Sequence, residues 1–241
     1  MPRTPHASQD TVKALEGGLI VSVQAYPGEP LRHPETMAQM ARACELGGAA
    51  AIRCQGLADI AAIKGQVDVP VIGLWKEGHA GVYITPTLRH ALACVHAGAD
   101  IVALDASDLP RPDGRTFEET VAAIRSTPGA DVALMADCRS MDDARRAARA
   151  DCDLISTTLS HGTAATDCTR EDGPDLDFLG AAARELPQVP IVCEGRVHTP
   201  ADVAAAFEAG AYAVVVGTAI THPTSITRWF AQEAPASQGR P

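Results

Sequence analysis

The chain has few aromatic side chains and no long apolar run. Phe, Trp and Tyr make up 4% of the 241 residues, whereas 46% are hydrophobic, so we expect a mainly aliphatic core. No apolar run approaches the roughly 18 residues that cross a bilayer. The opening segment MPRTPHASQD also lacks the apolar stretch of a secretory signal. The sequence therefore predicts a cytoplasmic protein with no place in a membrane.

Paired cysteine motifs and an excess of basic charge are absent as well. The seven cysteines are odd in number and include no CxxC pair, which argues against a disulfide framework and a zinc site. Thirty acidic residues outnumber 20 Lys and Arg residues, for a net charge of −10. Such a surface repels a polyanion, so nucleic acid is not an expected partner. One small phosphate is not excluded, because backbone N–H groups at a helix N-terminus can hold it locally.

What the chain does contain is a repeated unit: a helix that ends in small residues and glycine, a β-branched run, and then a polar stop. The segments ELGGAAAIR, HAGADIVALD and EAGAYAVVVG show this unit. Glycine tolerates the left-handed backbone at a helix end, and the apolar run suits a strand that is buried on both faces. We expect strands at residues 19–23, 50–53, 71–76, 101–104, 132–136, 154–156, 191–193 and 213–216. The clearest helices are expected at 34–46, 88–97, 117–125, 141–149, 176–186 and 200–209.

Eight strands that alternate with helices predict an α/β fold, a single-domain (β/α)8 TIM barrel. A length of 241 residues fits the roughly 250 that are typical of this fold. The rival is a doubly wound open sheet, which usually has about five or six strands and, for dinucleotides, a GxGxxG turn that this chain lacks. We expect the barrel over 11–233, a flexible segment over 1–10, a disordered tail over 234–241, and a short helix over 12–16 that plugs the bottom.

The polar residues that stop the strands are the first candidates for a site. In a barrel of parallel strands all carboxyl ends surround one mouth, so scattered positions converge on one pocket. These positions are Gln24, Arg53, Lys76, Asp105, Asp137, Thr157, Glu194 and Gly217.

The last two strands are followed by Glu194-Gly195-Arg196 and Gly217-Thr218-Ala219. Loops after the seventh and eighth strands of a barrel often bind phosphate, because glycines let backbone amides approach it. The sequence therefore predicts a phosphate site there.

Several specific stretches in the same order now point to one family. They are GLIVSVQAYPGEPL, AIR, GLWK with VYITPT, IVALDAS, LMADCRS, STTLS and CEGRVHTP. Over about residues 17–230 the chain resembles the bacterial N-acetylmannosamine-6-phosphate 2-epimerases of sialic acid and amino sugar catabolism. Members are phosphate-binding TIM barrels that need no metal or organic cofactor, and they interconvert N-acetylmannosamine 6-phosphate and N-acetylglucosamine 6-phosphate.

The resemblance implies a role for each candidate residue. Lys76 and Glu194 would form the catalytic acid/base pair. Substrate contacts would come from Gln24, Arg53 and Asp137, and the strand-end residues Asp105 and Thr157 join them as candidates. The phosphate would be held by Gly195, Arg196, Gly217 and Thr218. The chain departs from the family pattern at Cys54-Gln55-Gly56 and at His161-Gly162.

The chemistry agrees with these roles. Inverting a carbon that bears an N-acetyl group requires removal of its proton, which is acidic enough only beside an open-chain aldehyde. Two proton carriers on opposite faces are then wanted, together with hydrogen-bond donors at the enolate oxygen. Lysine acts as the base only if its pKa falls from about 10.4 toward neutrality, a change worth about 4 kcal/mol that burial or Arg53 can supply. Glu194 must be protonated to donate, so a raised pKa would help.

Other interpretations stay open. Arg53 could be a structural partner of Asp105 or Asp137. A ribulose-phosphate epimerase or a phosphoribosyl isomerase would share the phosphate loops, and so would a catalytically silent sugar-phosphate sensor. None of the eight histidines ends a predicted strand, so we expect no metal site, although His79 and His161 lie in mouth-side loops. Trp229 and Phe230 either pack the last helix onto a second subunit, as in the homodimer that the resemblance implies, or close the barrel.

Overall fold

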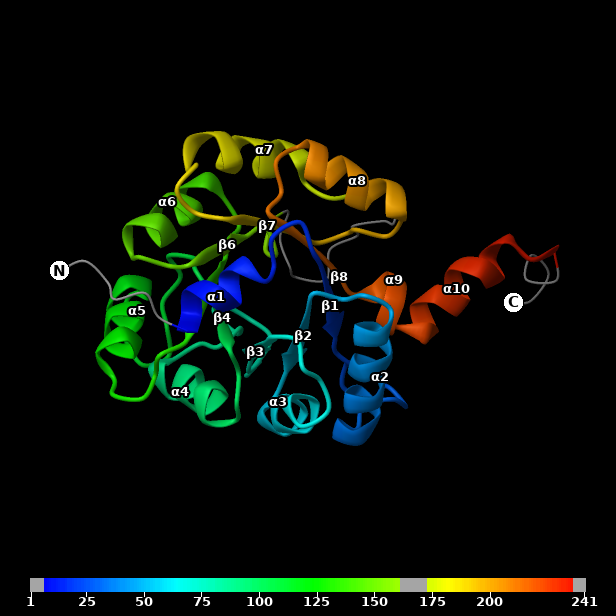
Figure 1. The fold of residues 1–241 in the computed structure, drawn as a ribbon, viewed down its shortest axis with the longest axis horizontal. Helices are drawn as coiled ribbons and strands as arrows, with labels where there is room; N and C mark the ends of the chain where they lie inside the picture. Colours follow the sequence, from blue (N-terminus) through cyan, green and yellow to red (C-terminus); the bar gives the residue numbers. More distant parts are fainter. Residues whose placement is uncertain (1–6, 161–172, 236–241) are drawn as a thin grey trace.

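Eight parallel strands close into a barrel in chain order (Figure 1). The structure is a computed structural model, and it describes residues 7–160 and 173–235. The barrel closes where β8 pairs with β1, with Ile20 opposite Val215. The strands are β1 Leu19–Val23, β2 Ala51–Gln55, β3 Val71–Leu74, β4 Ile101–Asp105, β5 Ala133–Asp137, β6 Leu154–Ser156, β7 Ile191–Glu194 and β8 Ala213–Val216. The predicted TIM barrel is confirmed, and the rival open sheet is excluded.

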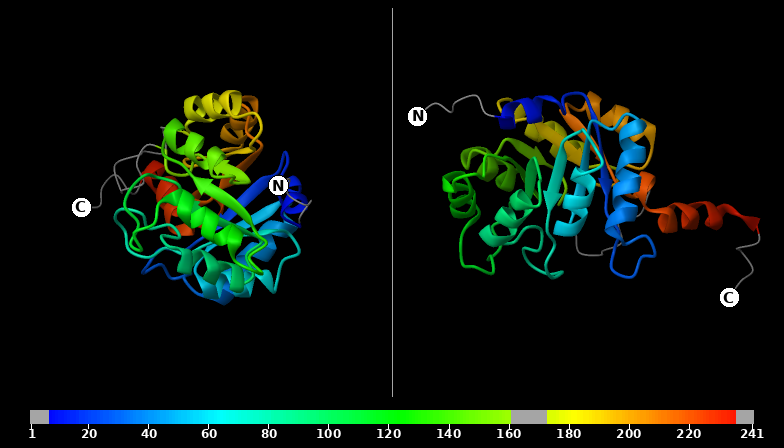
Figure 2. Two further views of the ribbon diagram at one scale, coloured as in Figure 1. Left: turned by 90° about the vertical axis from the view of Figure 1, so that its left-hand side faces the viewer. Right: turned by 60° about the horizontal axis from the view of Figure 1, so that its bottom comes forward.

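Seven helices follow the first seven strands and cover the outside of the barrel (Figures 1 and 2). They are α2 Pro34–Leu46, α3 Leu57–Lys64, α4 Leu88–His96, α5 Phe117–Ser126, α6 Met141–Arg149, α7 Leu176–Glu185 and α8 Pro200–Glu208. The helices expected at 34–46 and 141–149 have those bounds. Helix α8 begins at Thr199-Pro200: Thr199 caps it by accepting from the Asp202 N–H, and Pro200 is its first residue.

Side chains pack in two layers. Alternate strand residues point outward and meet the helices in one large aliphatic cluster. The others fill the barrel interior, where Ile20, Ile72, Ile101 and Met135 are buried. Because the interior is solid, a ligand can enter only at an end of the barrel.

A short helix, α1 Ala7–Lys13, lies across the end of the barrel where the strands begin (Figure 1). Leu15, just after it, is fully buried in the interior cluster. The Tyr212 hydroxyl donates to the Val12 carbonyl at 3.2 Å. The bottom plug predicted for 12–16 is therefore present, but its helix spans 7–13, so four residues of the segment expected to be flexible are helical.

The chain after β8 departs from the regular pattern. It forms the four-residue α9 Thr218–Thr221 and then α10 Pro223–Glu233, which extends away from the barrel (Figures 1 and 2). None of the α10 residues is fully buried, and Phe230 is 76% exposed.

Across the residues that the structure describes, no helix has the length and apolar character needed to span a bilayer.

Candidate active site

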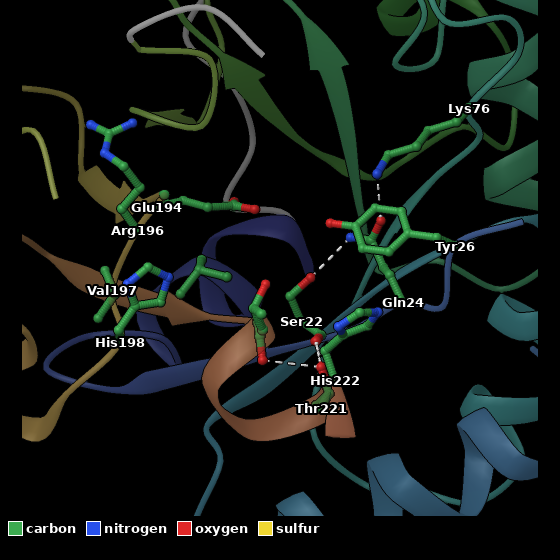
Figure 3. A pocket seen from close by; sticks show the side chains of 14 residues that line it. Ser22, Gln24, Tyr26, Lys76, Glu194, Arg196, Val197, His198, Thr221 and His222 are labelled. Carbon is green, nitrogen blue, oxygen red and sulfur yellow. Dashed lines mark hydrogen bonds between the residues drawn. The ribbon is translucent and has the colours of Figure 1, made fainter. Parts of the chain in front are cut away.

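The carboxyl ends of the strands surround a pocket of about 210 Å³ (Figure 3). Seven of the predicted site residues line it: Gln24, Lys76, Glu194, Gly195, Arg196, Gly217 and Thr218. They come from the ends of β1, β3, β7 and β8, as the convergence argument requires.

Lys76 lies two residues beyond the end of β3, in the loop rather than in the strand that was expected to reach it. Its Nζ donates to Gln24 Oε1 at 2.8 Å, and Gln24 Nε2 donates to Ser22 Oγ at 2.9 Å (Figure 3). Burial, helped by the positive charge of Arg53, lowers the pKa of Lys76 to about 8. A lysine in this state supplies both the neutral amine and the ammonium near neutral pH.

Glu194 ends β7 on the other side of the pocket. The Thr157 hydroxyl fixes its backbone, accepting from the Glu194 N–H at 3.0 Å and donating to its carbonyl at 2.9 Å. One carboxylate oxygen lies 3.2 Å from Arg53 Nε, and the other lies 3.0 Å from the Thr158 hydroxyl. Burial raises the pKa of Glu194; Arg53 opposes this, and the negative charge of Asp137 adds to it.

Arg53 and Asp137 form a buried ion pair beneath Glu194. Their side chains are 1% and 0% exposed, and two hydrogen bonds of 2.6 and 3.2 Å join the guanidinium to the carboxylate. The Thr158 hydroxyl lies 2.8 Å from Asp137 Oδ1. Asp105 and Asp137 were both considered as structural partners of Arg53, and the structure pairs Arg53 with Asp137. The same guanidinium also contacts Glu194.

Asp105 and Thr157 lie behind the pocket wall. Asp105 is fully buried, accepts from the Ser107 N–H at 2.8 Å and lies 3.4 Å from Arg139. Burial raises its pKa. The Thr157 hydroxyl bonds to the Glu194 backbone and so supports the site from outside the cavity. The Asp105 carboxylate bonds to Ser107 and Arg139, which do not line the pocket.

The predicted phosphate residues lie together at the β7 and β8 side. Gly195 and Arg196 have φ values of 108° and 55°, so the chain turns sharply there. A Cβ on Gly217 would lie 3.3 Å from the Ser22 Cβ, so glycine allows this close approach. The Arg196 guanidinium donates to the Gly173 carbonyl at 2.7 Å and lies away from Lys76 (Figure 3).

Sequence reasoning missed several pocket residues: Ser22, Tyr26, Val197, His198, Thr221 and His222. His222 Nε2 lies 3.2 Å from Glu29 Oε1, and the Tyr26 ring meets the His222 ring edge-on at 5.2 Å. Tyr26, Val197, His198, Thr221 and His222 belong to the stretches AYPGEP, CEGRVHTP and GTAITHP, which lie at or shortly after a strand end, whereas Ser22 lies within β1. That closeness to a strand end was the available signal.

Two histidines were singled out in mouth-side loops, and the structure describes one of them, His79. His79 is not among the residues that line the pocket, and His161 lies outside the described residues. Within the described ranges, no three His, Cys, Asp or Glu side chains are grouped so that they could hold a metal ion.

Fold and pocket together define a (β/α)8-barrel protein with two proton-carrying side chains, an amine and a carboxyl group, at the mouth. A family model described as "Putative N-acetylmannosamine-6-phosphate epimerase" matches residues 37–236. The chain belongs to this family.

Individual relatives agree with the family assignment. A Cutibacterium acnes protein named "Putative N-acetylmannosamine-6-phosphate 2-epimerase" is 56% identical over 91% of this chain and 94% of its own length. A protein of the same name from Caldanaerobacter subterraneus subsp. tengcongensis is 47% identical over 92% of each chain. The solved N-acetylmannosamine-6-phosphate 2-epimerase from Clostridium perfringens superposes with a TM-score of 0.85 at 34% identity, covering 97% of this chain and 99% of the other.

Proposed function

We propose that this protein is an epimerase that interconverts N-acetylmannosamine 6-phosphate and N-acetylglucosamine 6-phosphate, in amino sugar and sialic acid catabolism. The observation that carries the proposal is the pairing of Lys76 and Glu194 in one pocket, with pKa values shifted toward each other. The family and its relatives bear names for this activity.

The reaction proceeds on the open-chain sugar, whose C1 aldehyde makes the C2 proton acidic. Neutral Lys76 removes that proton, the electron pair of the C2–H bond moves into the C1–C2 bond, and the aldehyde oxygen takes the negative charge. Protonated Glu194 then returns a proton to C2 on the opposite face, and the roles exchange in the reverse direction. No metal or organic cofactor is needed for these two proton transfers.

The surrounding residues support this chemistry. Gln24 holds the amine of Lys76 at 2.8 Å, and Thr157 holds the backbone of Glu194, so both carriers are positioned before the sugar arrives. Gly195, Arg196, Gly217 and Thr218 are the proposed phosphate contacts. The charges of Arg53 and Asp137 shift the pKa values of Lys76 and Glu194. A direct contact of either residue with the sugar stays a prediction.

The test is proton NMR of the purified protein with N-acetylmannosamine 6-phosphate in deuterated water. We expect N-acetylglucosamine 6-phosphate with deuterium at C2 from the unaltered protein. Lys76→Met and Glu194→Gln should each lose this product. Lys13→Met and Glu208→Gln change the same residue types at exposed positions and should keep full activity.

The possible results separate the parts of the proposal. Full turnover by either pocket variant would reject the role of that residue. If the unaltered protein leaves the sugar unchanged and unlabelled, the substrate assignment fails and other sugar phosphates, including pentulose phosphates, become the next candidates.

We also propose that the protein is a homodimer joined through α10. Helices α2–α8 pack against the outside of the barrel, whereas α10 extends away from the barrel and exposes Phe230 (Figure 2). A second copy of the chain is the partner that the family resemblance implies. The cytoplasmic location expected from the sequence stays a prediction, which cell fractionation can test.

A further inference from the structure

The loop that carries Lys76 is a small hairpin folded over the barrel mouth. The Thr85 N–H donates to the Trp75 carbonyl at 2.9 Å, the Glu77 N–H donates to the Tyr83 carbonyl at 3.0 Å, and Lys76 pairs with Ile84 between them. Thr85 has a φ of 46°, a left-handed backbone that a β-branched residue rarely adopts. Strain of this kind persists only where the surroundings enforce it, and it is concentrated at functional sites.

His90 of helix α4 holds this hairpin from behind. Its side chain is 1% exposed, Nε2 lies 3.0 Å from Glu77 Oε2, and the imidazole ring packs on the Trp75 ring with centroids 4.4 Å apart. Trp75 and Glu77 are the two chain neighbours of Lys76. The same histidine therefore touches the residue before and the residue after the lysine.

Thr87 fixes the orientation of His90. Its hydroxyl lies 2.6 Å from His90 Nδ1. Because the Glu77 carboxylate accepts a hydrogen bond, Nε2 carries a proton, and in neutral His90 the Nδ1 atom then accepts from the Thr87 hydroxyl. The chain Thr87–His90–Glu77 thus selects one tautomer and one ring orientation.

Thr87 makes this bond instead of the one that its position normally provides. It is the N-cap residue of α4, yet its side chain accepts no bond from the helix backbone. Thr116, Ser140 and Thr199 occupy the same position in α5, α6 and α8, and each caps its helix. An N-cap side chain that accepts a backbone N–H usually stabilises its helix. The Thr87 hydroxyl does not make that bond and contacts His90 instead.

We propose that His90, oriented by Thr87, is the positioning residue of Lys76. It anchors both chain neighbours of the lysine to α4 and so keeps Nζ at Gln24 and at the reacting carbon. This inference rests on the proposed function of Lys76, and His90 itself does not line the pocket.

The first test replaces His90 with Leu and measures C2 deuterium incorporation at several substrate concentrations. We expect kcat to fall about 10- to 100-fold, the loss that a displacement of about 1 Å can cause, with KM little changed because the phosphate contacts lie on other strands. His96→Leu is the matched control, since His96 is exposed on the same helix, and it should keep kcat. An unchanged kcat in His90→Leu, or a change in KM alone, would overturn the inference.

Three further variants separate positioning from helix stability. Thr87→Val removes the bond to His90 and should lower kcat, whereas Thr87→Ser keeps a hydroxyl and should restore it. Thr116→Val removes a true cap from α5 and should lower the melting temperature without lowering kcat. Thr87→Val also keeps the inference testable if His90→Leu does not fold. Equal kcat values for the Val and Ser variants would contradict the proposed orientation.

Amide hydrogen exchange read by mass spectrometry tests the hairpin without any substrate. The peptide covering 75–85 should exchange faster in His90→Leu and Thr87→Val than in the unaltered protein or in His96→Leu. If the unaltered protein shows no C2 exchange, the proposed function fails and this measurement alone decides whether His90 holds the hairpin. If C2 exchange occurs but hairpin protection and kcat survive in His90→Leu, the epimerase stands and the positioning role is rejected.

Discussion

The charge of Arg53 acts on both Lys76 and Glu194. Its charge helps burial to lower the pKa of Lys76, and it works against burial at Glu194. Asp137 pairs with the same guanidinium and pushes the Glu194 pKa upward. The pair therefore keeps a positive charge near the amine while leaving the Glu194 carboxyl able to hold a proton.

This arrangement predicts a bell-shaped pH dependence of kcat/KM. The active pair holds one proton, either on Glu194 or on Lys76, and these two forms serve opposite directions of the reaction. Lowering the pH through the raised pKa of Glu194 adds a second proton, and raising it through the Lys76 pKa of about 8 removes the only one. Activity should fall on both sides.

The check is a pH series of kcat/KM measured from each sugar. Because both forms carry the same number of protons, the alkaline limb should lie near pH 8 in both directions. An alkaline limb near 10, the ordinary range for lysine, would show that Lys76 is not the titrating base.

Residue positions at strand ends were predictable, and those further along the loops were not. Gln24, Lys76 and Glu194 stop apolar runs, and they do line the pocket. Thr158, which touches both Glu194 and Asp137, lies two residues after β6, where the path of the loop decides which side chain turns inward. Asp105 also ends a strand, yet its carboxylate turns to Ser107 and Arg139, a choice that depends on neighbouring loops.

At the scale of elements, β3 depends on a glycine for its contact with the helix layer. A Cβ on Gly73 would lie 2.8 Å from both the Ala99 Cβ and the Ile60 Cδ1 of α3. We predict that Gly73→Ala destabilises the protein by about 1 to 3 kcal/mol, the usual cost of overpacking a dense core. Urea denaturation followed by circular dichroism measures this.

Gly65 provides the matched control, because it ends α3 with an ordinary negative φ and a Cβ there would keep 3.6 Å or more from its neighbours. Gly65→Ala should change the free energy of unfolding by less than about 0.5 kcal/mol. Equal stability of Gly73→Ala and the unaltered protein would mean that α3 shifts freely away from β3.

The helices and strands differ in how well their bounds could be predicted from the sequence. Helices such as α2 and α6 show apolar residues at three- and four-residue spacing, and their bounds were predicted. Helix α3, LADIAAIK, is apolar on nearly every side, so no single face is visible in its sequence. The strand expected over 71–76 ends at Leu74, because Trp75 and Lys76 pair with the returning hairpin instead of β4.

For the whole molecule, the direction of α10 predicts an assembly that depends on Phe230. Phe230→Glu places a charge on the most exposed aromatic side chain of this helix and should weaken the dimer at least about tenfold. Gln232→Glu adds the same charge two residues away and should leave the dimer intact. Light scattering over a range of concentrations measures both, and an unaltered protein that is monomeric throughout would refute the dimer.

The plug formed by α1 and Leu15 has a consequence for isotope labelling. Because the barrel interior is packed and α1 covers the end where the strands begin, solvent and sugar both reach the site through the mouth at the carboxyl ends of the strands. While the sugar occupies it, a proton taken by Lys76 is cut off from bulk water. In the proposed mechanism that proton can return only to the face it left, which regenerates the starting sugar, because the product receives its C2 proton from Glu194. In deuterated water, the deuterium at C2 of the recovered starting sugar therefore compares the lifetime of the enolate with the rate at which water reaches the amine.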